Sequence, residues 1–526
     1  LPAIKDKLQM ERFMMKQQEL NSLRQVDYEA VMALKQDYLK QVYNQEGKEV
    51  MLTDDFKKFF EENSDWLVPY AAFSYLRDTY KTADFRTWAK HSVYRKSEIT
   101  KLCSPDSKAY TDIALYYYIQ YQLHLQLLEV RNTARKEGVI IKGDIPIGIS
   151  RNSVEAWTEP HLFNLDGQAG APPDDFSVNG QNWGFPTYNW DYLKDNDYNW
   201  WKDRLKSASQ YYGAYRLDHI LGFFRIWAIP TRDTTAVLGH TVPNVPITRQ
   251  TLNNNGFDND RIRWLSQPHV PTGAVEDITW NHDSACKILE LFMNRVGNEE
   301  LWLFKDSMTG DKDIYEADLS SFCNEEASGR IKDVLSMYWR NRCLIELSTD
   351  NFVPVWTYYE STSWKSLSDD EKNKLKYLID CAENDQNYLW ETQSSEILSE
   401  LTNSVDMVPC GEDLGANLPC LPGVMDKNNI LALRVIRWCR KWAEQPVQPY
   451  TPLNELTELS VATSSVHDSP TLRQWWDEDK NGVNLFVRTY PWAFGLEGWD
   501  NDAINRVANE TFTPEKAQSF LMAVAQ

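Results

Sequence analysis

The feature that most constrains the fold is a set of short apolar runs that end in acidic residues. Five runs have the length and composition of β-strands: residues 139–149, 212–222, 405–413, 430–438 and 460–468. Most of them place acids at or near their C-terminal ends, namely Asp144, Asp218, Glu412 with Asp413, and Asp468. In a (β/α)8 barrel the active site forms at that end of the strands. The pattern therefore predicts an α/β protein whose catalytic domain is of the (β/α)8 TIM-barrel type.

Helical segments precede the first of these runs. Residues 112–137 have a long helical pattern that ends at Gly138, a residue suited to the left-handed position after a helix. The run that follows, "VIIKGDIPIGI", is typical of a strand covered on both faces, and helix, glycine and buried strand form the unit of parallel α/β folds. Farther upstream, residues 4–40 are predicted to be helical, Thr53 marks a helix start, and a second helix carries Tyr70.

The charge balance limits the possible partners. The 526 residues carry 55 Lys and Arg against 76 Asp and Glu, which gives a net charge of −21. A nucleic-acid or anionic-membrane partner needs a basic surface, so neither is expected, whereas a neutral ligand is not opposed. The sequence has no run of about 18 apolar residues, so no transmembrane helix is predicted.

The cysteines and the first residues bear on metals, compartment and chain ends. Eight cysteines are scattered, with no pair closer than Cys410 and Cys420. The lack of a Cys-x-x-Cys pair argues against a zinc site, and reduced thiols in a cytoplasm are the simplest interpretation. No metal or cofactor is predicted.

The opening "LPAIKDKLQMERF" has no apolar signal-peptide core and does not begin with Met, which suggests a piece of a longer protein.

Charged residues interrupt an otherwise apolar stretch, "YYGAYRLDHILGFFRIW", at residues 211–227. A buried charge costs several kcal/mol unless another group compensates it. Because side chains alternate along a strand, Arg216 and Asp218 point to the same side, about 7 Å apart. One interpretation is a structural ion pair at the mouth of a barrel. The other is an ionised nucleophile, kept anionic because the adjacent positive charge lowers the pKa of its carboxylate.

Two further acids follow other predicted strands. "PCGEDLG" places Glu412 between glycines that let the backbone turn sharply, although the acid of such a loop can also cap a helix. "SSVHDSP" adds His467 and Asp468, a pair that alone is more often structural than catalytic. Glycoside chemistry requires one ionised carboxylate to attack and one protonated carboxyl to release the leaving oxygen. A third acid can bind sugar hydroxyls and stabilise an oxocarbenium-like transition state.

Motifs for several other reaction classes are absent from the sequence. It has no His-Glu-x-x-His, no glycine-rich phosphate loop and no Gly-x-Ser-x-Gly elbow. The acids at the predicted strand ends therefore carry the functional interpretation.

Four segments of the chain are similar to one known family. They are "GAPPDDFSVNGQNWGFPTYNW" (170–190), "YRLDHILGFFRIW" (215–227), "PCGEDLG" (409–415) and "HDSPTLRQWW" (467–476). Together they resemble glycoside hydrolase family 77, the 4-α-glucanotransferases that include amylomaltases and disproportionating enzymes, from about residue 25 to the end. The resemblance implies a retaining double displacement on α-1,4-glucans or maltooligosaccharides, without a cofactor.

The resemblance also implies roles for individual residues. Asp218 matches the nucleophile of an Arg-x-Asp-His motif, Glu412 the general acid/base, and Asp468 the acid that stabilises the transition state. The carboxyl groups of a retaining pair lie about 5–5.5 Å apart. The residues predicted to bind sugar are Asp144, Asp174, Trp183, Arg216, His219 and His467. Trp183 falls in a loop that borders the acceptor side. Phe185 and Tyr188 are further candidate acceptor platforms, but both could equally belong to the core.

The spacing of the acids predicts an insertion, because Asp218 and Glu412 are much farther apart than a single barrel connection requires. The predicted division is a mainly helical part at 1–137, barrel strands three and four with a substrate loop at 150–200 within 138–230, the insertion at 231–380, and barrel strands five to seven within 381–526. Such an insertion resembles the plant cytosolic, type 2 branch of the family and its bacterial relatives.

The first two strands and the last strand of the family are not found, which leaves about five of eight. Because the missing strands are neighbours in a closed barrel, exposed edges are expected at 139–149 and 460–468, as in a fragment. Three functions remain open: a cytoplasmic 4-α-glucanotransferase of starch and maltose metabolism, an α-glucan hydrolase with the same carboxylates, or an inactive glucan-binding fragment. The sequence leaves the oligomeric state open.

Overall fold

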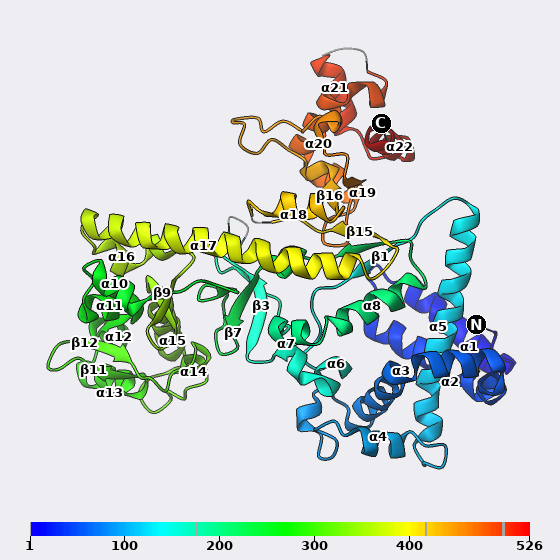
Figure 1. Ribbon diagram of the computed structural model, residues 1–526, viewed down its shortest axis with the longest axis horizontal. Helices are drawn as coiled ribbons and strands as arrows, with labels where there is room; N and C mark the ends of the chain where they lie inside the picture. Colours follow the sequence, from blue (N-terminus) through cyan, green and yellow to red (C-terminus); the bar gives the residue numbers. More distant parts are fainter. Residues whose placement is uncertain (1, 175–176, 416–417, 497–499, 526) are drawn as a thin grey trace. The chain divides into compact units, whose positions relative to one another are not determined.

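The computed structural model describes residues 2–174, 177–415, 418–496 and 500–525 (Figure 1). The chain divides into two compact units. The first comprises Leu1–Ile141, Gly148–Ala169 and Trp183–Asp197, and the second comprises Lys142–Ile147, Gly170–Asn182 and Tyr198–Gln526. Within the described residues, none of the helices combines the length and the apolar character needed to cross a membrane.

The first unit is mainly helical. Its helices are α1 (Lys7–Asn21), α2 (Tyr28–Leu52), α3 (Asp54–Tyr80), α4 (Lys96–Leu102), α5 (Tyr110–Lys136), α6 (Val154–Thr158) and α7 (Trp190–Asp195), with 3-10 turns at Phe85–Thr87 and Pro160–Leu162. A small sheet pairs β2 (Phe163–Asn164) with β5 (Thr187–Tyr188). The apolar core between α2, α3 and α5 includes the fully buried Val42, Leu67 and Ile113.

The predicted helix ends are observed where the sequence carries capping residues. α5 covers the helix predicted at 112–137, and Gly138 follows it with a φ of +70°. Thr53 caps α3, and its side-chain oxygen accepts a hydrogen bond from a first-turn N–H at 3.2 Å. The prediction of a separate second helix at Tyr70 is wrong, because α3 continues through Pro69. Proline removes one backbone donor, but buried residues on both sides of it hold the helix together through tertiary packing.

The second unit contains a five-stranded parallel sheet within the described residues. Its strands are β1 (Lys142–Ile145), β6 (Ala214–Leu217), β15 (Val408–Gly411), β16 (Leu431–Val435) and β17 (Ser460–Thr463), hydrogen-bonded in that order. Each strand lies inside one of the five predicted runs, and the order in the sheet equals the order in the chain, as in a (β/α)8 barrel. The predicted fold class is confirmed.

The first strand differs from the prediction that it is covered on both faces. Gly143 and Ile145 are buried, whereas Asp144 is exposed. Val139 and Ile140, which begin the predicted run, precede β1 and are also exposed. The alternation along β1 turns Asp144 away from the core and toward the charged residues at the strand ends.

The chain between β6 and β15 holds the segment predicted as an insertion. Its helices are α9 (Leu221–Phe224), α10 (Arg249–Asn254), α11 (Asn259–Ser266), α12 (Gly273–Thr279), α13 (His282–Phe292), α14 (Lys312–Tyr315), α15 (Glu325–Arg340), α16 (Thr362–Lys365) and α17 (Asp369–Thr402), with a 3-10 turn at Tyr358–Glu360. Its strands are β7 (Ile226–Pro230), β8 (His240–Val242), β9 (Ile247–Thr248), β10 (His269–Pro271), β11 (Met293–Arg295), β12 (Leu301–Phe304), β13 (Leu344–Ser348) and β14 (Asn351–Pro354).

These strands form three small sheets among the described residues. Two of them, ordered β10-β12-β11 and β13-β14-β9, each pack against a separate apolar cluster. In the third, β7 and β8 join β3 (Gly167–Ala171) and β4 (Gln181–Asn182). The long helix α17 begins at a capping box formed by Ser368 and Glu371 and leads the chain back toward β15.

The remaining helices accompany the central sheet and the C-terminal end. They are α8 (Asn199–Ser209), α18 (Leu421–Lys427), α19 (Leu472–Glu478), α20 (Lys480–Thr489), α21 (Asn501–Asn509) and α22 (Pro514–Ala525), with 3-10 turns at Ile436–Trp438, Leu453–Glu455 and Pro491–Phe494. α8 precedes β6, and α18 connects β15 with β16. The last four helices share an apolar core in which Trp476, Phe486 and Phe520 are fully buried.

Candidate active site

The register of the parallel sheet brings charged residues of neighbouring strands together. β1 pairs with β6 so that Asp144 lies opposite Arg216, and β15 pairs with β6 so that Cys410 lies opposite the same arginine. Asp218 and Glu412 each follow the last residue of their strand. Because parallel strands end at the same edge of a sheet, these carboxyl groups meet at the edge where barrel enzymes place their active sites.

Arg216 is the centre of this charged group. Its side chain is buried, and the guanidinium donates one hydrogen bond to Asp144 Oδ2 at 2.6 Å and another to Asp218 Oδ1 at 2.9 Å. Two carboxylates therefore compensate the buried positive charge, which otherwise costs several kcal/mol. The contact between Arg216 and Asp218 that both interpretations assume is present.

Glu412 is held against the turn that follows Asp218. Its Oε2 accepts a hydrogen bond from His219 N–H at 3.0 Å, and its backbone carbonyl accepts one from Ile220 N–H at 3.1 Å. His219 has a φ of +44°, a left-handed conformation that residues other than glycine rarely adopt. This strained turn directs a backbone donor at Glu412. The two carboxyl groups are thus connected through a single residue, since His219 follows Asp218 directly.

His219 is half-buried, although the resemblance assigns the residue to sugar binding. Burial and the nearby Arg225 lower the pKa of the His219 imidazole to about 4. The ring is therefore neutral at physiological pH, and the hydrogen bond that His219 gives to Glu412 comes from its backbone.

His467 and Asp468 reach the same group from the opposite end of the sheet. His467 Nδ1 lies 3.8 Å from Asp144 Oδ2, and His467 Nε2 lies 3.2 Å from Asp468 Oδ2. β1 and β17 are the two ends of the strand order, and in a flat sheet four strand spacings would separate them by about 19 Å. The contact therefore requires the sheet to curl until the carboxyl ends of its outer strands approach each other, as in part of a barrel.

Burial and charge act in opposite directions on Asp218. Desolvation raises the pKa of Asp218 most, Arg216 lowers it, and Asp144 and Asp468 raise it further. The net direction is upward, so the prediction that the arginine leaves this carboxylate with a lowered pKa is wrong. The physical reason is that Arg216 is shared with Asp144, while desolvation of the Asp218 carboxyl group outweighs the attraction of the arginine.

Glu412 has the more strongly perturbed carboxyl group of the pair. Desolvation raises the pKa of Glu412 to about 7, Arg216 opposes that shift, and the negative charge of Asp218 adds to it. A pKa this close to neutral pH lets one carboxyl group act both as an acid and as a base.

This shift predicts a pH-dependent stability difference for Glu412→Gln. The carboxyl pKa rises from an ordinary value of 4.5 to about 7 on folding, so the folded protein binds this proton more tightly than the unfolded chain. The contribution of this proton to the free energy of unfolding is complete below pH 4.5 and is lost as the pH rises through 7. Relative to wild type, Glu412→Gln should therefore gain about 1–3 kcal/mol of unfolding free energy between pH 5 and pH 8.

Urea unfolding followed by tryptophan fluorescence at the two pH values measures this difference. Glu61→Gln is the matched control, because Glu61 is exposed on α3. A difference between Glu412→Gln and wild type that does not change between pH 5 and pH 8 would contradict the raised pKa.

Of the predicted aromatic platforms, the structure buries one. Trp183 belongs to the first unit, where its ring stacks on that of Phe185 with centroids 5.7 Å apart. Tyr188 is only 7% exposed and packs against Phe163. Of the two interpretations of Tyr188, the one that places its ring in the core is therefore confirmed, and the one that makes it a platform is wrong.

Asp174, another predicted sugar-binding residue, shapes its own loop. It belongs to the second unit, and its Oδ1 accepts a hydrogen bond from Ser177 N–H at 2.7 Å. Residues 175 and 176 of the matching motif lie outside the described residues.

Sequence reasoning missed two arginines at the end of β16. Arg434 Nη1 donates a hydrogen bond to Asp413 Oδ2 at 2.9 Å. The buried Arg437 donates to Ser465 Oγ and Ser469 Oγ, both at 2.6 Å, and so supports the loop between β17 and α19 that carries the histidine and aspartate of the site. The available signal was a charge inside the apolar run "ILALRVIRW", the same signal that marked β6.

The chain is similar to known proteins in sequence and in fold. The chain is 36% identical over 475 residues to a 4-alpha-glucanotransferase (DPE2) from rice, Oryza sativa subsp. japonica, covering 89% of this chain and 49% of the rice protein. It is 24% identical to a 4-alpha-glucanotransferase from Chlamydia muridarum, with coverages of 97% and 69%. An amylomaltase from Streptococcus agalactiae, solved with acarbose, shares the fold with a TM-score of 0.53 at 19% identity, over 96% of this chain and 73% of that one.

The family assignment depends on how much of the chain the sequence pattern of one family matches. This chain spans about half the length of the rice relative. The sequence pattern of one family, described as 4-alpha-glucanotransferase, matches residues 3–523. The chain therefore belongs to glycoside hydrolase family 77, the 4-α-glucanotransferase family.

Proposed function

We propose that this chain carries the catalytic site of a 4-α-glucanotransferase, which moves glucosyl or maltooligosyl units between α-1,4-glucans. Family membership supports the substrate class. The observation that carries the reaction type is the pair of carboxyl groups at the ends of adjacent strands, Asp218 and Glu412, joined through the turn at His219. A retaining mechanism needs such a pair, with one member able to hold a proton near neutral pH.

The first half-reaction forms a covalent intermediate. Asp218 attacks the anomeric carbon of the donor, while the protonated Glu412 gives its proton to the glycosidic oxygen. The bond between that carbon and that oxygen breaks, the shortened glucan leaves with the proton, and a glycosyl-aspartate ester remains. Arg216 acts as a positioning residue, because it holds one carboxylate oxygen of Asp218 at 2.9 Å.

The second half-reaction releases the enzyme. The ionised Glu412 takes the proton of an acceptor hydroxyl, whose oxygen attacks the anomeric carbon and displaces Asp218. Two inversions at that carbon give overall retention. The side chains of His467 and Asp468 are each 64% exposed, and that of Asp144 is half-exposed. All three supply polar groups that bind sugar hydroxyls beside the reaction centre.

Transfer should dominate over hydrolysis when maltotriose is the substrate. An acceptor sugar that is oriented in the site can compete with water near 55 M, because effective molarities of well-oriented groups reach about 10⁵ M or more. We expect a ladder of maltooligosaccharides longer than maltotriose together with free glucose, resolved by chromatography over time.

The product pattern distinguishes the alternatives. If only maltose and glucose appear, the chain is a hydrolase with the same carboxylates. If maltodextrin binds and maltotriose stays intact, the chain is a glucan-binding protein without turnover. Either result overturns the proposed transfer, and the protein with Asp218→Asn serves as the inactive reference.

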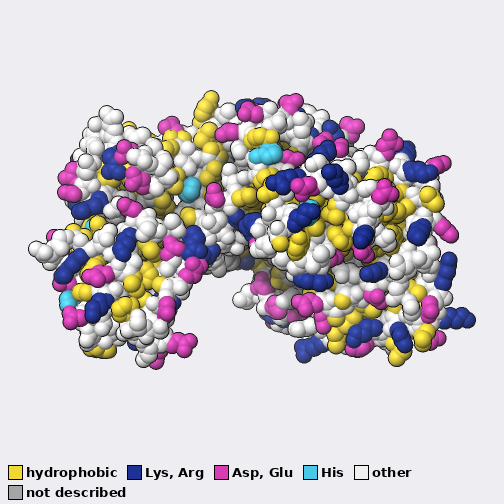
Figure 2. Space-filling model, turned by 90° about the horizontal axis from the view of Figure 1, so that it is seen from below, with side chains coloured by type: hydrophobic (Ala, Val, Ile, Leu, Met, Phe, Trp, Pro, Cys, Tyr) yellow, Lys and Arg dark blue, Asp and Glu magenta, His cyan; other side chains and the backbone are white. Residues whose placement is uncertain are grey.

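We further propose a cytoplasmic location with glucans as partners. The eight cysteines all lie within the described residues and are free thiols, which suits a reducing compartment. On the face shown in Figure 2, Lys and Arg side chains are interspersed with Asp and Glu side chains. Together with the net charge of −21, this pattern favours a neutral ligand over nucleic acid or an anionic membrane.

A further inference from the structure

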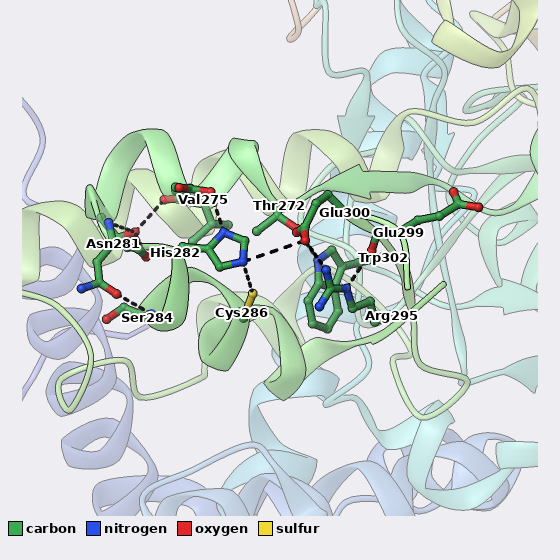
Figure 3. A network of polar contacts seen from close by, with 12 residues as sticks. Thr272, Val275, Asn281, His282, Ser284, Cys286, Arg295, Glu299, Glu300 and Trp302 are labelled. Atoms are coloured by element: carbon green, nitrogen blue, oxygen red, sulfur yellow. Dashed lines mark hydrogen bonds and ion pairs between the residues drawn. The ribbon is translucent and has the colours of Figure 1, made fainter. Parts of the chain in front are cut away.

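Three side chains of the kinds that bind metals meet in the chain between β6 and β15, away from the acids of the sheet. His282, Cys286 and Glu300 each offer one ligand atom, and these atoms all lie within 4.8 Å of one another. Figure 3 shows one nitrogen of the His282 imidazole facing both the thiol of Cys286 and the carboxylate of Glu300. The mechanism above uses none of the three.

The first two of these residues, His282 and Cys286, lie on the same helix. His282 begins α13 and Cys286 follows four residues later, so both side chains project from the same face of the helix. His282 Nε2 lies 3.5 Å from Cys286 Sγ. Tetrahedral zinc with bonds of about 2.0–2.1 Å to nitrogen and 2.3 Å to sulfur would hold those two atoms about 3.5 Å apart.

Glu300 approaches from a different element. It directly precedes β12, and its Oε1 lies 3.9 Å from His282 Nε2. The other carboxylate oxygen accepts a hydrogen bond from Thr272 Oγ1 at 2.5 Å, and that hydroxyl accepts one from Trp302 Nε1 at 2.8 Å. Thr272 and Trp302 are buried, so they orient Glu300 from inside the fold.

The other nitrogen of the His282 imidazole, Nδ1, also has a hydrogen-bond partner. His282 Nδ1 lies 2.9 Å from Glu276 Oε2, a carboxylate on α12. When Nδ1 donates its proton to Glu276, the lone pair of Nε2 faces Cys286 and Glu300. This carboxylate–histidine arrangement is the one that supports histidine ligands of zinc, because it fixes both the tautomer and the orientation of the ring.

A positively charged side chain, that of Arg295, contacts the cluster. Arg295 forms an ion pair with Glu300 Oε1, the oxygen that faces His282, and donates a hydrogen bond to the backbone carbonyl of Glu299 at 2.7 Å. With a thiolate at Cys286, the negative groups would be that thiolate, Glu276 and Glu300, against the single positive charge of Arg295. A dication brings this set to neutrality. The ion pair alone gives no role to the thiol, which is a soft ligand suited to zinc rather than to magnesium or calcium.

We propose that His282, Cys286 and Glu300 bind Zn²⁺ and that Glu276 supports the histidine. The ion would link α13 to the start of β12 and thereby connect two elements of the β10-β12-β11 part of the chain. Three protein ligands leave the fourth tetrahedral position for water. Binding energy at such a site adds to the stability of the elements that it joins.

Cobalt substitution tests the site directly. The purified chain is treated with a chelator, dialysed, and titrated with Co²⁺, and we expect one equivalent to produce a thiolate-to-cobalt charge-transfer band that Zn²⁺ then abolishes. Cys286→Ser should remove the band and weaken Zn²⁺ binding by tenfold or more. Glu276→Gln should keep the band and weaken Zn²⁺ binding by about 10–100-fold, as loss of a supporting carboxylate does.

Cys381→Ser is the matched control, because Cys381 is an exposed cysteine on α17, outside the cluster. It should leave both the band and the Zn²⁺ affinity unchanged. The proposal is overturned if the wild-type chain gives no charge-transfer band, or if Cys286→Ser binds Zn²⁺ as tightly as wild type. The wild-type titration alone decides the matter if a variant does not fold, and neither readout depends on glucan transfer.

Discussion

The chain with Asp218→Asn is expected to lose at least about 99% of its glucan transfer while still binding maltooligosaccharides. An amide cannot form the glycosyl ester, so both half-reactions stop, and loss of a covalent nucleophile costs several kcal/mol of transition-state stabilisation. The fold should persist, because Arg216 keeps its hydrogen bond to Asp144 at 2.6 Å. The amide oxygen of the new side chain can also still accept from the guanidinium.

Two measurements on the same preparation check this expectation. Glucose release from maltotriose reports turnover, and calorimetric titration with maltoheptaose reports binding. Asp203→Asn is the matched control, because Asp203 is 71% exposed on α8, and it should change neither value. Residual activity above about 1% would argue against Asp218 as the nucleophile. Loss of binding together with turnover would instead favour the structural ion pair that the sequence also allowed.

The strands of the site were predictable because their signals are local. Each of the five runs carries its own apolar pattern, and the acid that ends a run is part of the same short segment. Parallel strands then bring those ends together without further information. This is why the apolar runs placed Asp144, Asp218 and Glu412 at strand ends, although their roles came from the family resemblance, and why Arg216, a charge inside a buried strand, pointed to Asp218.

The contact between His467 and Asp144 was not predictable in the same way. It joins the two outermost strands of the sheet, so it depends on how strongly the whole sheet curls. The net pKa direction of Asp218 has a similar origin, because desolvation is the sum of everything packed around the carboxylate, whereas the sequence displayed only its arginine neighbour.

The cluster proposed to bind zinc shows a third limit. The four-residue spacing of His282 and Cys286 is visible in the sequence, but a search for paired cysteines passes over it. Glu300 joins them through the tertiary fold. The helix through Pro69 and the buried Tyr188 have the same explanation, since packing from distant residues decides whether a proline ends a helix and whether an aromatic ring is exposed.

Glu412→Gln should show an effect that depends on the leaving group. With maltotriose, whose departing sugar oxygen must be protonated, the loss of the acid should slow the first half-reaction by about 10²–10⁴-fold. With an α-maltosyl fluoride donor, fluoride leaves without that proton, so the first half-reaction should proceed within about tenfold of the wild-type rate. The glutamine still has an oxygen that can accept from His219 N–H, so the turn beside Asp218 is preserved.

A burst of fluoride release makes this prediction decisive. The second half-reaction needs Glu412 as a base, so the variant should release about one equivalent of fluoride rapidly and then stall as the glycosyl-aspartate. Asp218→Asn is the matched control, because it cannot form that ester and should give no burst with the same donor. An equal loss of rate on both donors would remove Glu412 from the acid role. The burst in the Glu412 variant would show that the ester still forms without the acid, whereas a merely structural role for Glu412 would slow both donors alike.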